Sequence, residues 1–163
     1  MFKIEENESS VKFVISSEMK LVERVVKLSR EFIERENPRG FSGIKLIIRE
    51  TMINAIEHGN KNIAALLVQC SIEQLNARRF KISVTDEGEG FDYRNINLAI
   101  PEDPLKIRHR GLPLVNALAD SMEFNEKGNE VSAYFTIQTG TEFIIEKSED
   151  MNVIRPTGDI TAA

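Results

Sequence analysis

The order of helix-like and strand-like hydrophobic patterns most constrains what this chain can fold into. Apolar residues alternate with polar ones over short runs, which favours strands, and recur every three or four residues over longer runs, which favours helices. The resulting order is strand, helix, helix, strand, strand, helix, strand, strand. It predicts an α+β two-layer sandwich, in which a mixed, mostly antiparallel sheet carries the helices on one face. The expected strands span residues 11–15, 65–74, 80–85, 121–125 and 130–138, and the expected helices span about residues 16–36, with Ser16 and Ser17 as the cap, 42–58 and 112–119.

The size and charge of the chain limit its functional class. Its 163 residues suit one domain, which we place at residues 1–140 with a tail at 141–163. The N-terminal segment has no signal-peptide core, no run is apolar enough to span a membrane, and a single cysteine gives no disulfide framework. We therefore expect a cytoplasmic protein. Its net charge of −5 and its dispersed basic residues argue against nucleic acid as a direct partner.

Three polar side chains recur at a spacing of four in the second expected helix. Glu50, Asn54 and His58 therefore stack on one face. This pattern suits a magnesium-bound nucleotide, because Mg²⁺ takes oxygen ligands and keeps waters and substrate phosphates around it. Asn54 would offer its carbonyl oxygen, and Glu50 would polarise a water or hydroxyl near the terminal phosphate. The same stripe is typical of a solvated helix edge, and the helix dipole favours a histidine in the last turn.

An acidic, glycine-rich turn follows the expected strand at residues 80–85. Asp86 stands at the end of that strand, and Gly88 and Gly90 follow it. A carboxylate here can accept a hydrogen bond from an exocyclic amine and so select adenine over guanine. The glycines would let the base lie against bare backbone. Plain connections between strands are also commonly rich in Asp and Gly, so the turn alone leaves both interpretations open.

A second glycine element opens the third expected helix. Arg108 and Arg110 precede Gly111 and Leu112 there. A helix N-terminus offers free amides to anions, and the two arginines oppose the helix dipole unless an anion lies nearby. We therefore expect this element to contact phosphates. A capped helix start that merely follows basic residues has the same composition.

These three elements, in this order, resemble the histidine-kinase-like ATPase superfamily with its Bergerat nucleotide-binding fold. Residues 49–60 look like its N box, residues 84–92 like its first glycine box, and residues 110–115 like its second. Residues 101–105 resemble the short lid of one branch, the anti-sigma factor serine-protein kinases. The resemblance covers about residues 10–138.

The resemblance implies roles for residues of this chain. Glu50 would be the base, Asn54 would bind Mg²⁺, and Asp86 would contact the adenine of ATP or ADP. The family further implies transfer of the γ-phosphate to a serine or threonine of a small anti-anti-sigma (STAS) partner, sequestration of a sigma factor, and a homodimer. The other expected nucleotide-binding residues are His58, Gly88, Gly90, Arg108, Arg110, Gly111 and Leu112.

Three functional hypotheses remain open from the sequence. A serine/threonine protein kinase fits because neither His58 nor His109 lies on a separate phosphoacceptor helix of the kind a two-component sensor kinase needs. A nucleotide-dependent module that sequesters a partner, with little or no kinase activity, fits because His109 stands where the second glycine box often has a glycine. A structural adaptor that binds no nucleotide is the third.

The tail also has two interpretations. Residues 143–145 favour one more strand, and residues 158–161 resemble the first strand of a STAS domain. A frayed chain end fits the same residues.

Overall fold

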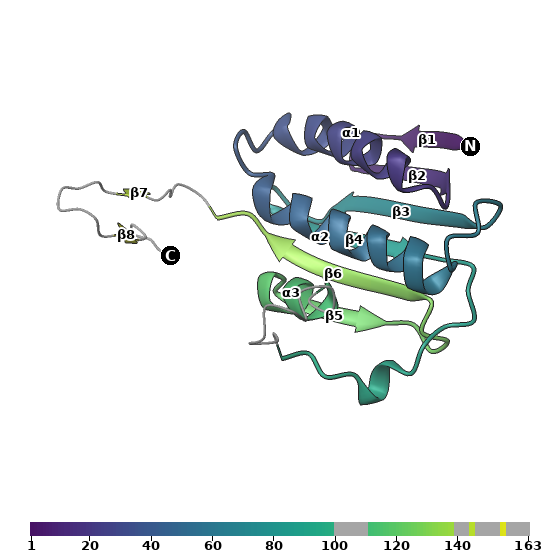
Figure 1. Ribbon diagram of the computed structural model, residues 1–163. Helices are drawn as coiled ribbons and strands as arrows, with labels where there is room; N and C mark the ends of the chain where they lie inside the picture. Colours follow the sequence, from purple (N-terminus) through teal and green to yellow (C-terminus); the bar gives the residue numbers. More distant parts are fainter. Residues whose placement is uncertain (100–110, 139–143, 146–153, 156–163) are drawn as a thin grey trace.

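Six strands form the main sheet. The computed structural model describes residues 1–99 and 111–138, together with the short strands at 144–145 and 154–155. The spatial order is β1-β2-β3-β4-β6-β5, and all five pairings are antiparallel (Figure 1). The sheet is thus antiparallel throughout the described residues, without the parallel pair that a mixed sheet would contain. The strands are β1 (Phe2–Glu6), β2 (Ser10–Ser16), β3 (Leu67–Gln74), β4 (Arg79–Thr85), β5 (Ser121–Phe124) and β6 (Glu130–Thr136).

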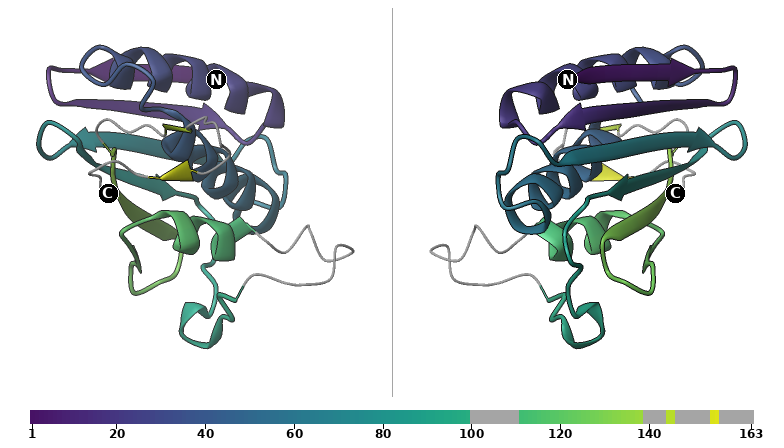
Figure 2. Two further views of the ribbon diagram at one scale, coloured as in Figure 1. Left: turned by 90° about the vertical axis from the view of Figure 1, so that its left-hand side faces the viewer. Right: turned by 90° about the vertical axis from the view of Figure 1, so that its right-hand side faces the viewer.

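The three α-helices of the described residues cover one face of this sheet (Figures 1 and 2). They are α1 (Val22–Glu34), α2 (Ser42–Asn54) and α3 (Gly111–Leu118). The middle helix, α2, contacts both other helices as well as β3, β4 and β6. The expected two-layer sandwich is confirmed. Within the described ranges, no helix combines the length and the apolar character that crossing a membrane requires.

The core lies between these two layers because side chains alternate between the two faces of a sheet. One row of cross-strand neighbours runs from β2 to β6 through Phe13, Cys70, Val84 and Val131, and all four side chains are buried. Burial of apolar surface, at roughly 25 cal/mol per Å², is the main force that holds the layers together. This packing of α2 against the sheet places the end of α2 beside the end of β4. Four α2 side chains in the same core have 0% exposure: Ile44, Ile47, Ile48 and Met52.

The edge strand β1 was not predicted from the sequence. Four of its five side chains are exposed, so its alternating pattern gives a weak signal. Phe2 attaches the strand to the molecule. Its ring meets Phe13 edge-on with centroids 6.1 Å apart, and the guanidinium of Arg24 lies 4.0 Å from its centre.

The expected helix cap at Ser16 and Ser17 is wrong. A 3₁₀ turn at Met19–Leu21 comes first, and α1 then begins at Val22 without a side-chain cap. The Ser17 hydroxyl instead donates to the carbonyl oxygen of Leu66 at 2.7 Å. A partner distant in sequence has replaced the local capping bond.

The second helix changes form at its end. It is α-helical to Asn54, and a π-helical turn, Ala55–Gly59, follows where the sequence predicted a continuous α-helix. The N–H of Asn60 donates to the carbonyl oxygen of Ala55 at 2.8 Å, which is the i→i+5 bond of a π turn. Such single turns occur frequently at functional sites.

Two short strands pair with each other outside the main sheet. They are β7 (Ile144–Ile145) and β8 (Ile154–Arg155), in antiparallel register. A strand at about residues 143–145 was expected. The assignment of the tail to a second domain stays a prediction.

Candidate functional site

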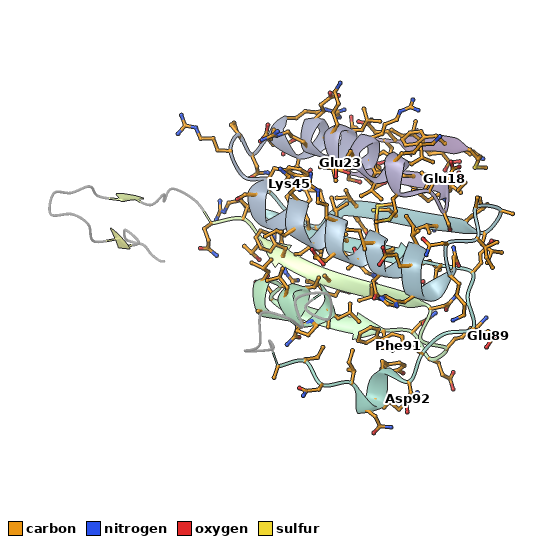
Figure 3. All side chains as sticks on the ribbon, viewed as in Figure 1. Glu18, Glu23, Lys45, Glu89, Phe91 and Asp92 are labelled. Carbon is orange, nitrogen blue, oxygen red and sulfur yellow. The ribbon has the colours of Figure 1, made fainter. Side chains whose placement is uncertain are left out.

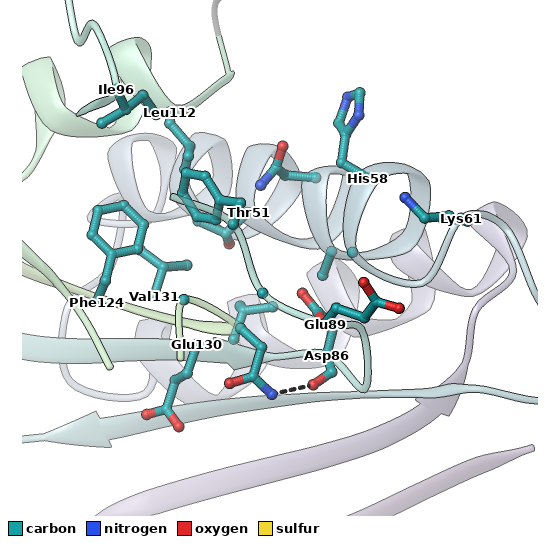
Figure 4. A pocket seen from close by; sticks show the side chains of 18 residues that line it. Thr51, His58, Lys61, Asp86, Glu89, Ile96, Leu112, Phe124, Glu130 and Val131 are labelled. Carbon is teal, nitrogen blue, oxygen red and sulfur yellow. Dashed lines mark hydrogen bonds between the residues drawn. The ribbon is translucent and has the colours of Figure 1, made fainter. Parts of the chain in front are cut away.

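A cavity of about 300 Å³ opens between the end of α2, the end of β4 and the β5–β6 hairpin. Its lining joins two of the predicted elements, because Asn54 and His58 face it together with Asp86 and Gly90. A concave, partly apolar hollow with a few polar groups is the usual form of a small-molecule site. Figure 4 shows the lining side chains, among them Thr51, Lys61, Glu89, Leu112 and Phe124.

Asp86 lies directly after β4, at the strand end where the sequence placed it. Its N–H donates to the carbonyl oxygen of Asn129 at 2.9 Å, and the side-chain amide of Asn129 donates to its carbonyl oxygen at 2.7 Å (Figure 4). The carboxylate accepts the N–H of Gly88 at 2.8 Å. Burial raises the pKa of this carboxyl, while the Gly88 bond and the charge of Lys127 oppose that rise. A half-buried carboxylate held in this way can accept a further hydrogen bond from an amino group of a ligand.

The π turn brings two residues against this acidic turn. A Cβ on Gly59 would overlap the carboxylate of Asp86, so only glycine allows the observed approach. Asn60 is 0% exposed, and its Oδ1 accepts the N–H of Glu87 at 2.8 Å. Neither residue was predicted to have a role of its own in the site. Their long-range contacts appear only in the folded chain.

The two glycines of the acidic turn face other parts of the backbone. A Cβ on Gly88 would overlap the carbonyl oxygen of Gly59. Gly90 has a φ of 88°, and a Cβ there would overlap the carbonyl oxygen of Lys127. The turn therefore needs both glycines in order to pack against the π turn and the β5–β6 hairpin. Gly90 also lines the cavity, and contact of a base with its backbone stays a prediction.

A second cavity, of about 290 Å³, adjoins the first. Glu50, Asn54 and His58 all line it, so these three side chains follow one face of the helix as their spacing predicts. Gly111, the first residue of α3, lines it too, and a Cβ there would lie 3.4 Å from Oε1 of Glu50. The structure thus brings the second glycine element to the N box. Asn54, His58 and Leu112 line both cavities, which makes them two parts of one elongated site.

The two shared polar residues occupy different positions in this site. Asn54 is half-buried, and its side chain makes no hydrogen bond within the part of the chain that the structure describes. His58 is exposed at the rim, and its imidazole points away from Asp86 (Figure 4). Asn54 is therefore the better placed of the two to meet a ligand inside the site.

An aromatic wall closes the first cavity and was not found from the sequence. Tyr93 stacks on Phe124 with ring centroids 4.9 Å apart, and Phe91 meets Phe124 edge-on at 5.3 Å. Phe91 and Phe124 line the cavity, and Phe91, which is exposed, lies near Glu89 and Asp92 (Figure 3). Flat apolar rings suit the face of a nucleobase. The three rings come from two separated segments, so no spacing in the sequence connects them.

The residues present fit a magnesium–nucleotide complex better than an all-protein metal centre. Among the described residues, no three His, Cys, Asp or Glu side chains come close enough together to hold a metal ion. Asn54 has a carbonyl oxygen to offer in a cavity that also contains Glu50. Mg²⁺ is commonly held by one or two protein oxygens, with waters and phosphates completing its shell.

Some predicted site residues lie outside the described ranges. These are Arg108 and Arg110, together with His109 and the lid at residues 101–105. The roles of both arginines in binding phosphate stay predictions.

Comparison with protein-family models identifies the arrangement. The model of the histidine kinase-like ATPase domain matches residues 14–135, which is most of the chain. The chain belongs to the histidine kinase-like ATPase family. The match extends from β2 to β6 and contains the N box, the acidic turn and the start of α3. A search of curated proteins found no match. As a histidine kinase-like ATPase domain, the chain binds ATP or ADP. Glu50, Asn54 and Asp86, to which the resemblance gave roles, line the two adjoining cavities.

Proposed function

We propose that the chain is an ATP-binding serine/threonine protein kinase and anti-sigma-type regulator, which phosphorylates a small anti-anti-sigma (STAS) partner in the cytoplasm. The observation that carries this proposal is the meeting of Glu50 with Gly111 in the second cavity, beside Asn54. A carboxylate there lies at the opposite end of the elongated site from Asp86. That is where the terminal phosphate of a nucleotide would lie if Asp86 holds the base.

Each residue of this site has a definite part in the proposed transfer. Asp86 accepts a hydrogen bond from the adenine amine. The N–H groups at the start of α3 face the phosphates, since a helix N-terminus favours anions. Asn54 offers its carbonyl oxygen to Mg²⁺, which when bound offsets the charge of the phosphates.

Glu50 acts as the general base. The hydroxyl oxygen of the acceptor serine forms a bond to the γ-phosphorus while the bond from that phosphorus to the β,γ-bridging oxygen breaks. ADP leaves, and Glu50 takes the hydroxyl proton. A positioned base contributes about 10²–10⁴ in rate, and the remainder of the effect comes from alignment and charge stabilisation.

A transfer assay tests this function. The chain is incubated with Mg²⁺, γ-labelled ATP and candidate STAS proteins from the native cell, and labelled serine or threonine is identified by mass spectrometry. A STAS partner in which the labelled serine is replaced by alanine serves as the control and should stay unlabelled. Label on a histidine of the chain itself, with none on a partner hydroxyl, would contradict the proposal.

A second candidate function is partner sequestration controlled by nucleotide, with little or no phosphoryl transfer. The construction of the Asp86 end supports it, because hydrogen bonds within the chain already hold the acidic turn in place. Such a site can bind ATP whether or not transfer follows. In the same assay, tight ATP-dependent binding of a partner without label would favour this candidate.

The proposed regulator works as a homodimer and can hold a sigma factor. We expect the dimer to form through the N-terminal strand at residues 11–15, which is part of β2, and through the first helix, α1. The neighbouring β1 can take part, because it is an edge strand with one side of its backbone unpaired within the described residues. Light scattering that gives the mass of one chain would contradict the dimer. Isolation of bound proteins from the native cell tests whether a sigma factor is among them.

A further inference from the structure

The segment that follows the π turn is tied to the acidic turn by one buried side chain. Asn60 is 0% exposed, and its side chain forms three hydrogen bonds. Its Oδ1 accepts the N–H of Glu87 at 2.8 Å. Its amide nitrogen donates to the hydroxyl of Ser17 at 2.8 Å and to the carbonyl oxygen of Leu67 at 3.0 Å. One side chain therefore connects the end of β2, the start of β3 and the turn after β4.

The hydrogen bond to Glu87 acts on the residue next to Asp86. The N–H that Asn60 accepts follows directly after Asp86 in the chain, and the next N–H, that of Gly88, donates to the Asp86 carboxylate at 2.8 Å. The side chain of Glu87 adds a second tie, since its Oε1 accepts the N–H of Leu67 at 2.8 Å. The hydrogen bonds of Asn60 and Glu87 thus fix the path of the turn, and with it the direction of the Asp86 carboxylate.

The neighbouring Gly59 supplies the other half of the contact. Its Cα lies so close to the Asp86 carboxylate that any Cβ would overlap the carboxylate, and its carbonyl oxygen lies against Gly88. A small shift of the acidic turn toward the π turn would create a clash, and a shift away would break the bond from Glu87 to Asn60. The turn therefore has one well-defined position.

We propose that Asn60 is a positioning residue for Asp86, which holds the carboxylate in the place where it reads the amino group of adenine. Asn60 itself touches no nucleotide, because it is buried behind the turn and does not line either cavity. Its effect on ATP binding passes through Glu87 and Asp86. The inference rests on the proposed contact between Asp86 and adenine and is independent of phosphoryl transfer.

The test compares two nucleotides that differ only in that amino group. ATP and purine riboside triphosphate, which lacks the 6-amino group, are each titrated into the full chain with Mg²⁺ by calorimetry. The ratio of their dissociation constants measures how much the 6-amino group adds to the affinity of the chain for the nucleotide. We expect a ratio of about tenfold or more for the original chain, because hydrogen bonds to a charged acceptor are stronger than neutral ones.

The Asn60→Ala variant should lose most of this preference, with a ratio below about threefold. The Asn60→Ala change in an Asp86→Asn background should alter ATP affinity little further, since both act on one contact. Equal weakening of both nucleotides in Asn60→Ala, with an unchanged ratio, would overturn the positioning role and indicate general loosening of the fold.

A matched control comes from another buried asparagine. Asn37 is 8% exposed and donates to the carbonyl oxygen of Ala77 at 3.0 Å, at the opposite end of β4 from Asp86. Asn37→Ala should lower the melting temperature and keep the nucleotide ratio of the original chain. A drop in the ratio equal to that of Asn60→Ala would overturn the proposal.

If Asn60→Ala does not fold, Ser17→Ala decides the question. That variant removes one of the two acceptors that orient the Asn60 amide and leaves Asn60 in place. A lowered nucleotide ratio supports the positioning role, and an unchanged ratio overturns it. An original chain that binds both nucleotides equally would overturn both this inference and the Asp86 assignment, while leaving the transfer chemistry of Glu50 to its own assay.

Discussion

At the Asp86 end of the site, other parts of the chain hold the polar groups, whereas at the Glu50 end the side-chain amide of Asn54 has no such partner among the described residues. Asp86 is held by Asn129 and Gly88, and the turn behind it by Asn60. The side chain of Asn54 makes no hydrogen bond within the described residues. Preorganised groups raise affinity because little order is lost on binding. The difference agrees with the proposal that the Asp86 end holds the base and the Glu50 end meets the phosphates and the metal.

If this contrast is real, substitutions at the two ends should have separable effects. The largest is expected for Glu50→Gln, which keeps the shape of the side chain and removes the base. Phosphoryl transfer should fall by about 10²–10⁴, while ATP affinity stays within a few-fold. Single-turnover transfer and calorimetry measure the two quantities.

Glu57→Gln is the matched control for that variant. Glu57 is exposed, lines the same second cavity and has no assigned part in the transfer, so its rate should stay near that of the original chain. Normal turnover by Glu50→Gln would show that the base lies elsewhere.

The next largest effect is expected at the Asp86 end of the site, where the adenine is proposed to bind. Asp86→Asn replaces the acceptor of the adenine amine by a group that presents a donor as well, and ATP affinity should fall by about a hundredfold, since bonds to charged groups contribute about 1.5–3 kcal/mol. Asp92→Asn changes an exposed carboxylate of the same loop, which accepts a bond from Asn95 at 2.7 Å, and should bind ATP normally. Micromolar affinity retained by Asp86→Asn would remove the adenine assignment.

A smaller effect is expected from the glycine that touches this carboxylate. Gly59→Ala adds a methyl group that must push the Asp86 side chain aside, and ATP affinity should drop by about tenfold, the equivalent of about one hydrogen bond. Gly111→Ala is the comparison at the other end, because a Cβ there would lie at an ordinary 3.4 Å from Glu50 and would leave in place the N–H groups that are proposed to face the phosphates. Calorimetry should show a clear loss for the first variant and little change for the second. Equal losses would break the contrast between the two ends.

The smallest predicted effect is on stability and pH. Burial raises the pKa of Asp86, so the folded chain holds this proton more tightly than the unfolded chain does. The contribution of this group to the stability of the fold is therefore lost as the pH rises from the ordinary carboxyl pKa of 3.8 through the raised pKa of the folded chain. Without ATP, Asp86→Asn should melt slightly higher than the original chain at pH 7, and the gap should narrow toward pH 4. A lower melting temperature of the variant at pH 7 would show that keeping this carboxylate ionised does not reduce the stability of the folded chain.

The sequence predicted those parts of the fold whose signal is local. The buried strands alternate clearly, and their hairpins are short, so β3 and β4 were expected within two residues of their observed bounds. β1 was missed because only Phe2 is sheltered from solvent in that strand. The cap at Ser16 and Ser17 was wrong because Ser17 has distant partners in Leu66 and Asn60.

The same distinction applies to the site. The spacing of Glu50, Asn54 and His58 is local, and so is the place of Asp86 at a strand end. The approach of Gly111 to Glu50 was not predicted, because the two residues come from separate segments that no spacing rule connects. Asn60 and the aromatic wall depend on contacts between distant segments, which no pattern in one sequence reveals.

The π turn at Ala55–Gly59 makes the form of the backbone matter as much as residue identity in this stretch. A π turn holds one residue more than an α turn. An ordinary α-helix with the same number of residues would therefore rotate Gly59 and Asn60 around the axis, away from the acidic turn that both now contact. A change that favours an α turn here would thus misplace both residues without altering either of them.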